Sequence, residues 1–236
     1  MKRFSLLLII LMFSSHLLSA QTKRIASFSL DQFGGPSPSI ELNGKLYFSA
    51  CDSIHGRELW STDGTAEGTT MVKDIFPGLD GSISGYFEYF SSVHNGILYF
   101  RANDGVSGEE LWRSDGTDSG TYLLKDVTFG SSGSSVGEFA SSGAYFYFTA
   151  NTGSQLWRSD GTTVGTFSVG SFQIVRNLCG VNGQLIFSAD NSNTGEEVWK
   201  YNPANGNVVL LKDLNGVVGT SLPCNFHSTG SLAFFL

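Results

Sequence analysis

Four copies of a short segment centred on tryptophan recur along this chain of 236 residues. Three copies are nearly identical and the fourth has diverged: ELWSTDGT at 58–65, ELWRSDGT at 110–117, QLWRSDGT at 155–162 and EVWKYNPA at 197–204. Successive tryptophans lie 42 to 52 residues apart. A period of this length is typical of an array of equivalent supersecondary units. We therefore expect tandem repeats, in which the residues shared by all copies build the repeat.

The second copy, at about 83–130, shows most clearly what one repeat contains. Four short stretches rich in apolar or aromatic residues are separated by turn residues, and Asn95-Gly96 is a strong hairpin signal. No stretch beyond residue 20 shows helical spacing of apolar residues over three turns. The pattern predicts four strands per repeat. The expected strands are 86–93, 97–102, 109–114 and 121–127.

Tandem four-stranded antiparallel units most often form the blades of a β-propeller, because radial stacking buries both faces of each small sheet. We expect an all-β propeller with an incomplete ring. The alternative is a β-solenoid, whose rungs are shorter and lack Asn-Gly hairpins. We expect the repeat domain to span 21–236, with a fourth-strand-like segment at 24–28 before the first repeat. The repeats are expected at about 30–77, 83–130, 137–170 and 174–216, with a partial unit at 221–236.

Residues 1–20 have the features of a secretory signal peptide. Lys2 and Arg3 precede an apolar stretch, and Leu18-Ser19-Ala20 forms a cleavage site before Gln21. A membrane anchor is the alternative, but the apolar run is broken well short of the roughly 20 residues that a spanning helix needs. We therefore expect a secreted, extracellular or cell-surface protein.

Charge and cysteine content restrict the partners and the covalent structure. The net charge of −7 argues against nucleic acid and anionic membranes as partners. We expect an extracellular glycan or protein partner and no membrane insertion. The sequence leaves the oligomeric state open. Three cysteines are too few for a disulfide scaffold. The sequence leaves open whether Cys179 and Cys224 form a bridge or remain thiols.

The repeated tryptophans could serve either as sugar-stacking platforms or as core residues. A large ring at the same place in each repeat favours packing between sheets, with the indole N–H bonded locally. We interpret these residues as structural. They are Trp60, Trp112, Trp157 and Trp199.

The repeated Asp-Gly pairs in the loops after the tryptophans could bind metal or form turns. An aspartate side chain can accept backbone N–H bonds in an Asx turn, and the following glycine frees the backbone. The fourth copy has Asn202 in this loop, which a turn tolerates better than a cation site does. We favour the turn. The pairs are Asp63-Gly64, Asp115-Gly116 and Asp160-Gly161.

A second set of loop aspartates precedes the tryptophan strands. Asp52, Asp104 and Asp190 are weak candidates for Ca²⁺ ligands, since Ca²⁺ prefers oxygen ligands. No 12-residue calcium-loop pattern accompanies them. We therefore expect no cofactor, with weak Ca²⁺ binding as the alternative.

Signals for an enzyme are weak. Neighbouring residues on a strand point to opposite faces, so neither Glu109-Glu110 nor Glu196-Glu197 forms a catalytic pair by itself. Because the other copies carry Arg57-Glu58 and Ser154-Gln155 there, we interpret the position as an exposed edge. Residues 133–137 match G-x-S-x-G but lack the following helix of a nucleophile elbow. We predict no catalytic residues and a protein that is not an enzyme.

The signature E-L-W-x-S-D-G-T-x-x-G-T-x-x-x-K-D, best seen at 110–126, resembles the ELWxxDGT-repeat proteins. These hyalin-like proteins are secreted or displayed by Gram-negative bacteria. The resemblance implies a non-catalytic extracellular module for adhesion, surface organisation or glycan or protein binding. We expect the loops Phe76–Gly85 and Phe129–Gly137 to carry the contacts. The alternative is a secreted propeller enzyme of glycosidase or lyase type, or an accessory domain of one.

Overall fold

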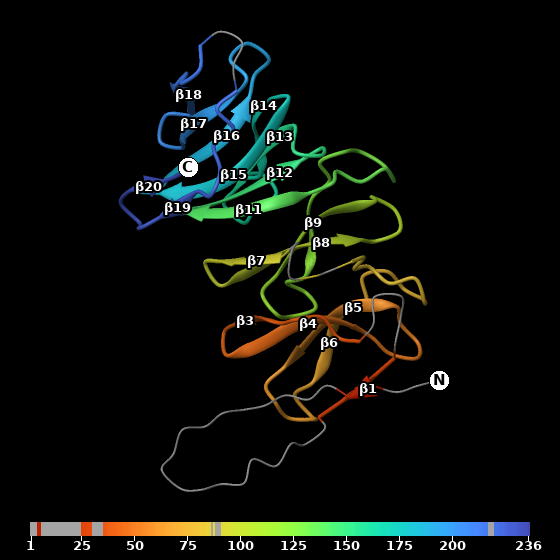
Figure 1. Cartoon of the computed structure of the whole chain (residues 1–236). Coiled ribbons are helices and arrows are strands. Elements are labelled where there is room, and N and C mark those ends of the chain that lie inside the picture. The colour runs from red at the N-terminus through yellow and green to blue at the C-terminus, as the bar shows by residue number, and fades with distance from the viewer. Residues whose placement is uncertain (1–3, 6–24, 30–34, 86, 88–90, 217–219) are drawn as a thin grey trace, which may run out of the picture.

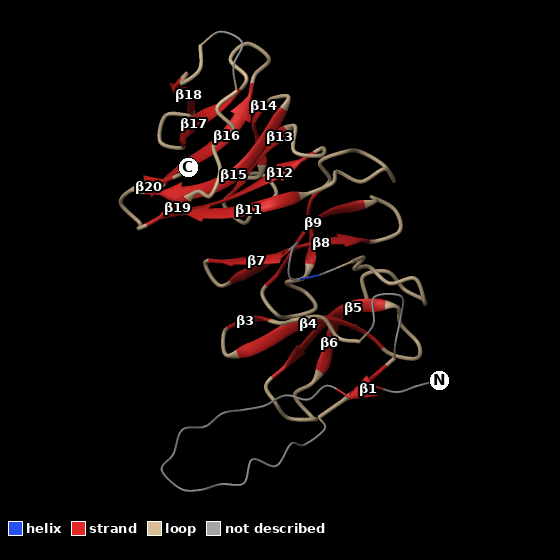
Figure 2. Ribbon diagram, viewed as in Figure 1, coloured by secondary structure: helices blue, strands red, loops and turns tan. Residues whose placement is uncertain are grey.

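The computed structural model describes residues 4–5, 25–29, 35–85, 87, 91–216 and 220–236. Strands and loops make up nearly all of this part of the chain (Figure 2). Four four-stranded antiparallel sheets follow one another along the sequence and stack face to face (Figure 1). This arrangement of tandem sheets confirms the β-propeller fold.

Each sheet keeps its strands in chain order. The first sheet contains β3 (Ile40–Leu42), β4 (Lys45–Cys51), β5 (Arg57–Thr62) and β6 (Thr70–Lys73). The second contains β7 (Ser91–His94), β8 (Ile97–Asn103), β9 (Glu109–Ser114) and β10 (Tyr122–Lys125). The third contains β11 (Gly137–Ser142), β12 (Tyr145–Ala150), β13 (Gln155–Ser159) and β14 (Phe167–Ser171). The fourth contains β15 (Ile174–Val181), β16 (Gln184–Asp190), β17 (Glu196–Asn202) and β18 (Asn207–Lys212).

The first strand of each sheet is the innermost. β7 contacts both β3 and β11, and β15 contacts both β11 and β19, so these strands follow one axis. Because neighbouring strands are antiparallel, each first strand begins at the same end of its sheet as the second strand finishes. Loops between the second and third strands, and loops between successive sheets, therefore lie at one end of that axis.

Local sequence explains the hairpins between first and second strands. Asn95 and Gly96 both adopt positive φ, at 49° and 73°, as a two-residue type I′ turn requires. Asn43-Gly44 and Asn182-Gly183 repeat this conformation in the first and fourth sheets. In the second repeat the turn lies where the sequence predicts it, between β7 and β8. The first strand there begins at Ser91 and ends at His94, whereas 86–93 was expected, and residues 86 and 88–90 of that range lie outside the described residues.

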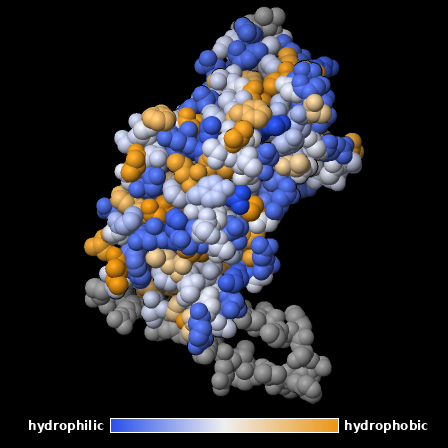
Figure 3. Space-filling model, turned by 180° about the vertical axis from the view of Figure 1, so that it is seen from behind, coloured by the Kyte–Doolittle hydropathy of each residue, from blue (hydrophilic) through white to orange (hydrophobic). Residues whose placement is uncertain are grey.

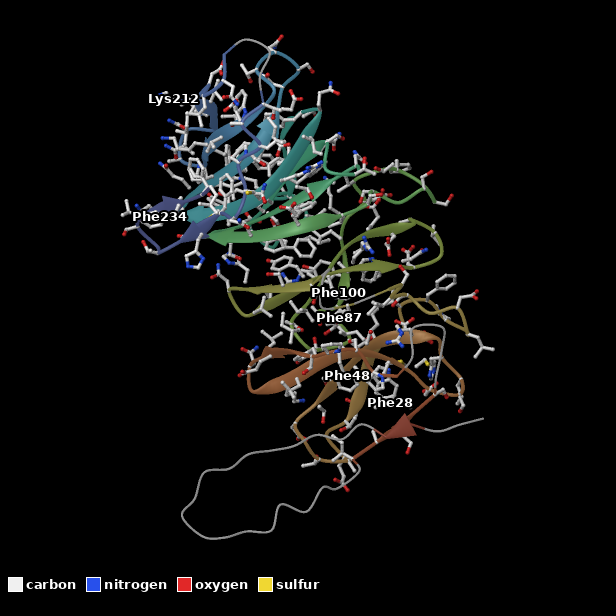
Figure 4. The ribbon with its side chains drawn as sticks, viewed as in Figure 1. Phe28, Phe48, Phe87, Phe100, Lys212 and Phe234 are labelled. Carbon is white, nitrogen blue, oxygen red and sulfur yellow. The ribbon has the colours of Figure 1, made fainter. Side chains whose placement is uncertain are left out.

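Apolar side chains fill the layers between successive sheets. Between the first two sheets, Tyr47 and Leu59 on one side face Phe100, Ala102 and Trp112 on the other. Figure 4 shows Phe48 in the first sheet and Phe100 in the second, each at the same place in its repeat. The next two layers repeat the pattern with equivalent residues. Both faces of an inner sheet are therefore buried, which explains strands that are apolar at nearly every position.

A two-stranded sheet flanks the four sheets on each side. β1 (Phe4–Ser5) pairs with β2 (Ser27–Phe28), where the segment resembling a fourth strand was expected, and Phe28 packs edge-on against Phe48 and Trp60. The predicted signal peptide at 1–20 lies outside the described residues except for Phe4 and Ser5. At the other end, β19 (His227–Ser228) and β20 (Ala233–Phe234) form the partial fifth unit.

The two flanking two-stranded sheets sit at opposite ends of the stack, because the first and fourth sheets are the outermost of the four (Figure 1). None of the described residues belongs to a helix long and apolar enough to cross a bilayer.

Candidate functional site

The repeated Asp-Gly-Thr loops are closed hydrogen-bonding units. Asp63 Oδ1 accepts the Thr65 N–H at 2.9 Å and the Thr65 hydroxyl at 2.7 Å, and Thr65 Oγ1 accepts the Gly68 N–H at 2.9 Å. The same three bonds recur in the loops of Asp115 and Asp160. Hydrogen bonds from the threonine hydroxyls and amides lower the pKa of all three aspartates. The carboxylates therefore act as turn acceptors.

The glycine that follows each aspartate has a conformation that favours glycine. Gly64, Gly116 and Gly161 adopt φ between 89° and 93°, a region that residues with a Cβ rarely occupy. In two copies there is a second reason, because a Cβ on Gly116 would overlap the Tyr47 hydroxyl of the preceding sheet, and Gly161 meets Tyr99 in the same way. In these two copies the glycine thus lets one sheet approach the next.

The loop aspartates considered as Ca²⁺ ligands lie at the ends of the second strands of three different sheets. Asp52 Oδ1 accepts the N–H groups of Ile54 and His55, and Asp104 Oδ1 accepts those of Val106 and Ser107. Asp190 Oδ1 accepts one N–H, from Ser192. Within the described ranges, no three His, Cys, Asp or Glu residues gather as a metal site would require. The structure therefore does not bring these aspartates together.

Each repeated tryptophan faces the sheet that precedes its own. Trp112 and Trp157 are 6% and 9% exposed and lie in the layers before the second and third sheets. Trp60 and Trp199 are partly buried in equivalent layers. Trp157 Nε1 donates to Gln155 Oε1 at 2.9 Å, and Trp199 Nε1 donates to the Ala189 carbonyl at 3.0 Å.

The expectation of a locally bonded indole N–H is therefore wrong for two of the four tryptophans. The Nε1 atoms of Trp60 and Trp112 are buried and have no hydrogen-bond partner among the described residues. In these two copies the position before Leu-Trp holds a glutamate, whose oxygens are used by the following loop. A tryptophan that stacks against a sugar needs an open ring face. Trp112 and Trp157 are too deeply buried to offer one.

The interpretation of the acidic pairs as an exposed edge is wrong. Glu58, Glu110 and Glu197 are 0% exposed, and Glu196 and Arg57 are 7% and 4% exposed. The residues begin the third strand of each sheet, where the loop to the next sheet folds over them. Burial of a carboxylate is costly unless it is hydrogen-bonded, so the contacts of these glutamates decide their role.

Each buried glutamate holds the loop that leads to the next sheet. Glu58 accepts the N–H groups of Ile75 and Phe76 at 3.2 and 3.1 Å, and the Ser82 hydroxyl at 2.5 Å. Glu110 accepts the equivalent groups of Val127, Thr128 and Ser134. Glu197 accepts the Leu214 N–H and the Ser221 hydroxyl. We call this arrangement the glutamate latch.

The latch explains two further sequence features. Strand β10 ends at Lys125, before the expected Val127, because the Val127 N–H bonds to Glu110 in place of a neighbouring strand. Ser134, which precedes the central Ser135 of the G-x-S-x-G match, is 0% exposed and donates to Glu110. Ser134 is a scaffold residue, whereas Ser135 is exposed. Burial raises the pKa of Glu58 and Glu110 above the usual glutamate range.

The third repeat lacks the latch and has shorter loops. Gln155 replaces the glutamate, and β14 leads almost directly from Ser171 into β15 at Ile174. The second-to-third strand loop is also shorter. Gly153 follows Ala150 by three residues, whereas the equivalent glycine follows its alanine by six residues in the other copies. Both truncations lie at the same end of the axis.

A hollow opens where these loops are short. It has a volume of about 330 Å³ and takes residues from β8, from the starts of β11 and β15, and from the turn between β12 and β13. The charged and polar lining residues that matter for chemistry are Arg101, Glu138, Thr149, Thr152 and Arg176. We call this hollow the axial pocket. Figure 3 views the molecule from behind and shows a surface in which polar and apolar residues are interspersed.

The arginines of the axial pocket are held by glutamates. Arg101 Nε lies 3.1 Å from Glu109 Oε2, and Arg101 Nη1 donates to the Val136 carbonyl at 3.3 Å. Arg176 Nη1 lies 4.0 Å from Glu196 Oε2, and its side chain is 52% exposed. Both glutamates occupy the position immediately before a latch residue. In each acidic pair of the sequence, the second glutamate is therefore the latch residue and the first contacts an arginine of the pocket.

The sequence did not single out the five polar pocket residues. A signal was nevertheless present in the third copy. Its loop between the second and third strands is three residues shorter, Gln155 replaces the glutamate, and the Lys-Asp pair of the signature is missing. The loop 129–137, one of the two loops expected to carry contacts, supplies Ser135, Val136 and Gly137 to the pocket lining. The other expected loop, Phe76–Gly85, lies outside the pocket lining.

None of the three cysteines, all of which lie in the described part of the chain, forms a disulfide. Cys51 and Cys179 are buried, and Cys224 is exposed. Cys51 Sγ donates to the Ser29 carbonyl at 3.1 Å. The bridge between Cys179 and Cys224 that the sequence left open is not formed in the structure.

No family model and no curated protein matches the sequence. Among solved structures, puromycin hydrolase superposes with a TM-score of 0.53 at 14% identity, over 92% of this chain and 35% of that chain. A substituted form of it, complexed with PGG, gives a TM-score of 0.53 at 13% identity, over 91% and 34%. TolB from Acinetobacter baumannii gives 0.43 at 15% identity, over 82% and 46%.

The chain therefore spans about a third of the length of puromycin hydrolase. At such low identity the likeness is one of fold, and it agrees with the propeller architecture described above.

Proposed function

We propose that this chain is a non-catalytic, extracellular binding module for adhesion, surface organisation, or glycan or protein binding, with the axial pocket as its ligand site. One observation supports the pocket as the ligand site. It lies where the third repeat differs from the other copies, having shorter loops and lacking the latch glutamate. The repeated acidic and hydroxyl residues are occupied within the scaffold by the Asp-Gly-Thr loops and the glutamate latch. Ligand pockets of about 300 Å³ or more, with a few placed polar groups, are typical of small-molecule sites.

The extracellular location is part of this proposal. It is supported by the signal-peptide pattern at 1–20 and by the resemblance to ELWxxDGT-repeat proteins over roughly Leu42 to Leu236. Expression of the full chain in a Gram-negative host, followed by N-terminal sequencing of the exported protein, tests it. A mature terminus at Gln21 is expected. Retention of Met1 in the cytoplasm would contradict the proposal.

The binding role is tested with a chain of residues 21–236 applied to immobilised outer-membrane and capsule fractions. We expect saturable binding that is reduced by Arg176→Gln without a change in melting temperature. Equal binding by an unrelated acidic β-sheet protein would contradict a specific module. Loss of binding that always accompanies unfolding would contradict the pocket assignment.

A secreted glycosidase or lyase is a second candidate, and one observation favours it. Glu138 lines the axial pocket, and the two arginines that line it contact Glu109 and Glu196, so three carboxylates gather at one end of the axis. Glycosidases use such carboxylates in pairs. Release of new reducing ends or unsaturated sugars from a polysaccharide panel, abolished by Glu138→Gln, would establish an enzyme.

A further inference from the structure

We infer that the axial pocket recognises an uncharged, polyhydroxylated ligand about the size of one or two sugar rings, such as a neutral saccharide unit. This inference rests on the proposed binding function and names the ligand class for the same site. Its basis is the combination of donors, acceptors and a threonine hydroxyl within the pocket.

One hydroxyl of the lining belongs to Thr149. This residue lies in the pocket wall and is 3% exposed. The equivalent Ser188 of the fourth sheet donates to Glu196 at 2.8 Å. A threonine hydroxyl is both donor and acceptor, so it can pair with a ligand hydroxyl in the pocket.

The charged groups supply both kinds of polar contact. Arg176 presents a half-exposed guanidinium with several donors, and Glu138 presents a carboxylate that accepts the Leu178 N–H at 3.3 Å. A sugar hydroxyl can accept from the guanidinium and donate to the carboxylate in the same complex. The apolar lining from Val136, Ile174 and Val175 suits the C–H surface of a ring.

The charge balance opposes an anionic ligand. Arg101 and Arg176 contribute two positive charges, while Glu109, Glu138 and Glu196 contribute three negative charges at the same end of the axis. The whole chain carries −7. A carboxylate or phosphate would have to displace one of the glutamates and approach against the field of the protein. An uncharged ligand meets no such penalty.

Backbone conformation supports a functional role for the pocket. Ser135 and Thr152 line it with φ of 48° and 58°. Such a conformation is unusual for any residue with a Cβ and strongly disfavoured for β-branched threonine. Conformations of this kind persist where surrounding structure imposes them, and they gather at binding sites. Here Asn151 fixes the turn, since its N–H donates to the Ser134 carbonyl at 2.6 Å.

The inference is tested with residues 21–236 and a panel of neutral mono-, di- and trisaccharides of glucose, galactose, mannose and N-acetylglucosamine. Matched uronate and sialyl oligosaccharides form the anionic arm. Binding is measured by saturation-transfer NMR and isothermal titration calorimetry. We expect a neutral sugar to bind at least ten times more tightly than its charged counterpart. Thr149→Val, Glu138→Gln and Arg176→Gln should each weaken binding at least fivefold.

The controls are Thr70→Val on β6 and Lys212→Gln on β18, both exposed and distant from the pocket. Figure 4 labels Lys212 on the outer strand of the fourth sheet. These controls should leave affinity unchanged, and melting temperatures should match the parent chain within about 2 °C.

Three outcomes would overturn the inference. Preference for the charged sugars would refute the ligand class. Neutral-sugar binding that survives all three pocket variants would refute the site but leave a binding module. Absence of binding by every sugar at millimolar concentration would refute both ligand class and site, and the envelope-binding measurement would then decide the proposed function separately.

Discussion

The hydroxyl of Tyr47 in the first sheet occupies the space that a Cβ on Gly116 of the second sheet would need. Tyr47 is 3% exposed and packed in the layer between the two sheets, so it has little freedom to move aside. Gly116 itself has φ of 93°. The same relationship joins Tyr99 to Gly161 in the next layer. The repeated glycine is thus a contact between repeats as well as a turn residue.

This contact predicts the effect of Gly116→Ala. The positive φ and the overlap with Tyr47 should together lower the free energy of unfolding by about 2–4 kcal/mol. Gly206→Ala is the matched control, since Gly206 has φ of 72° but no atom within 4 Å of the added Cβ. It should cost only about 1–2 kcal/mol. Urea denaturation of both variants measures the difference. Equal losses would show that the Tyr47 contact contributes nothing.

The glutamate latch predicts a large effect of Glu110→Ala. This change leaves the N–H groups of Val127 and Thr128 and the Ser134 hydroxyl without their acceptor. We expect the free energy of unfolding to fall by about 3 kcal/mol, since each buried unsatisfied group costs about 1–3 kcal/mol. Glu67→Ala, at an exposed loop position, should have almost no effect. A loss below about 1 kcal/mol for Glu110→Ala would contradict the latch.

The raised pKa of Glu110 predicts an opposite pH effect from that of an ordinary paired carboxylate. Burial raises its folded-state pKa above the unfolded value of about 4.3. The folded protein therefore binds the proton more tightly, and the resulting stability is complete below the unfolded pKa and is lost as pH rises through the folded pKa. Relative to Glu110→Gln, the parent should lose stability between pH 4 and neutrality. Denaturation curves across that range test the sign.

Asp115 should show the reverse dependence. Hydrogen bonds from the Thr117 hydroxyl and amide lower its folded-state pKa below the unfolded value of about 3.9. Its contribution is present above the unfolded pKa and is lost as pH falls through the folded pKa. Relative to Asp115→Asn, the parent should therefore lose stability only in strong acid. A difference between the two proteins that stays constant from pH 2 to 7 would contradict the assignment.

The carboxylates of the Asp-Gly-Thr loops should make the fold independent of Ca²⁺. Asp63, Asp115 and Asp160 accept internal hydrogen bonds, and the structure places Asp52, Asp104 and Asp190 at the ends of strands in three different sheets. A bound cation would raise the melting temperature by mass action. We expect excess CaCl₂ or EDTA to shift it by less than about 1 °C. A Ca²⁺-dependent rise removed by Asp104→Asn would reveal a site.

Local signals in the sequence predict most of the fold. Asn-Gly pairs set the hairpins, and short stretches of apolar and aromatic residues mark the strands, because both patterns act through near neighbours. The buried glutamates escaped prediction because a charged residue at the start of a strand normally marks an exposed edge. Their partners lie 17 to 24 residues further along the chain, as with Glu58 and Ser82.

The sequence did not predict the axial pocket, for a related reason. It is formed by the absence of loop residues in the third copy, and its lining comes from three sheets. Arg101 and Arg176 are 75 residues apart, so no local pattern joins them. A comparison of loop lengths among the copies would have indicated the position of the hollow but not its chemistry.

The central claim is that the shared residues of the repeats build the scaffold and that the shortened third repeat forms the binding site. The most direct test replaces Asn151-Thr152 with the five-residue loop 103–107 of the second repeat and measures binding of the neutral saccharide panel by saturation-transfer NMR. The account predicts a folded chain with an unchanged melting temperature and no saccharide signal. A folded graft that binds as well as the parent chain would contradict it.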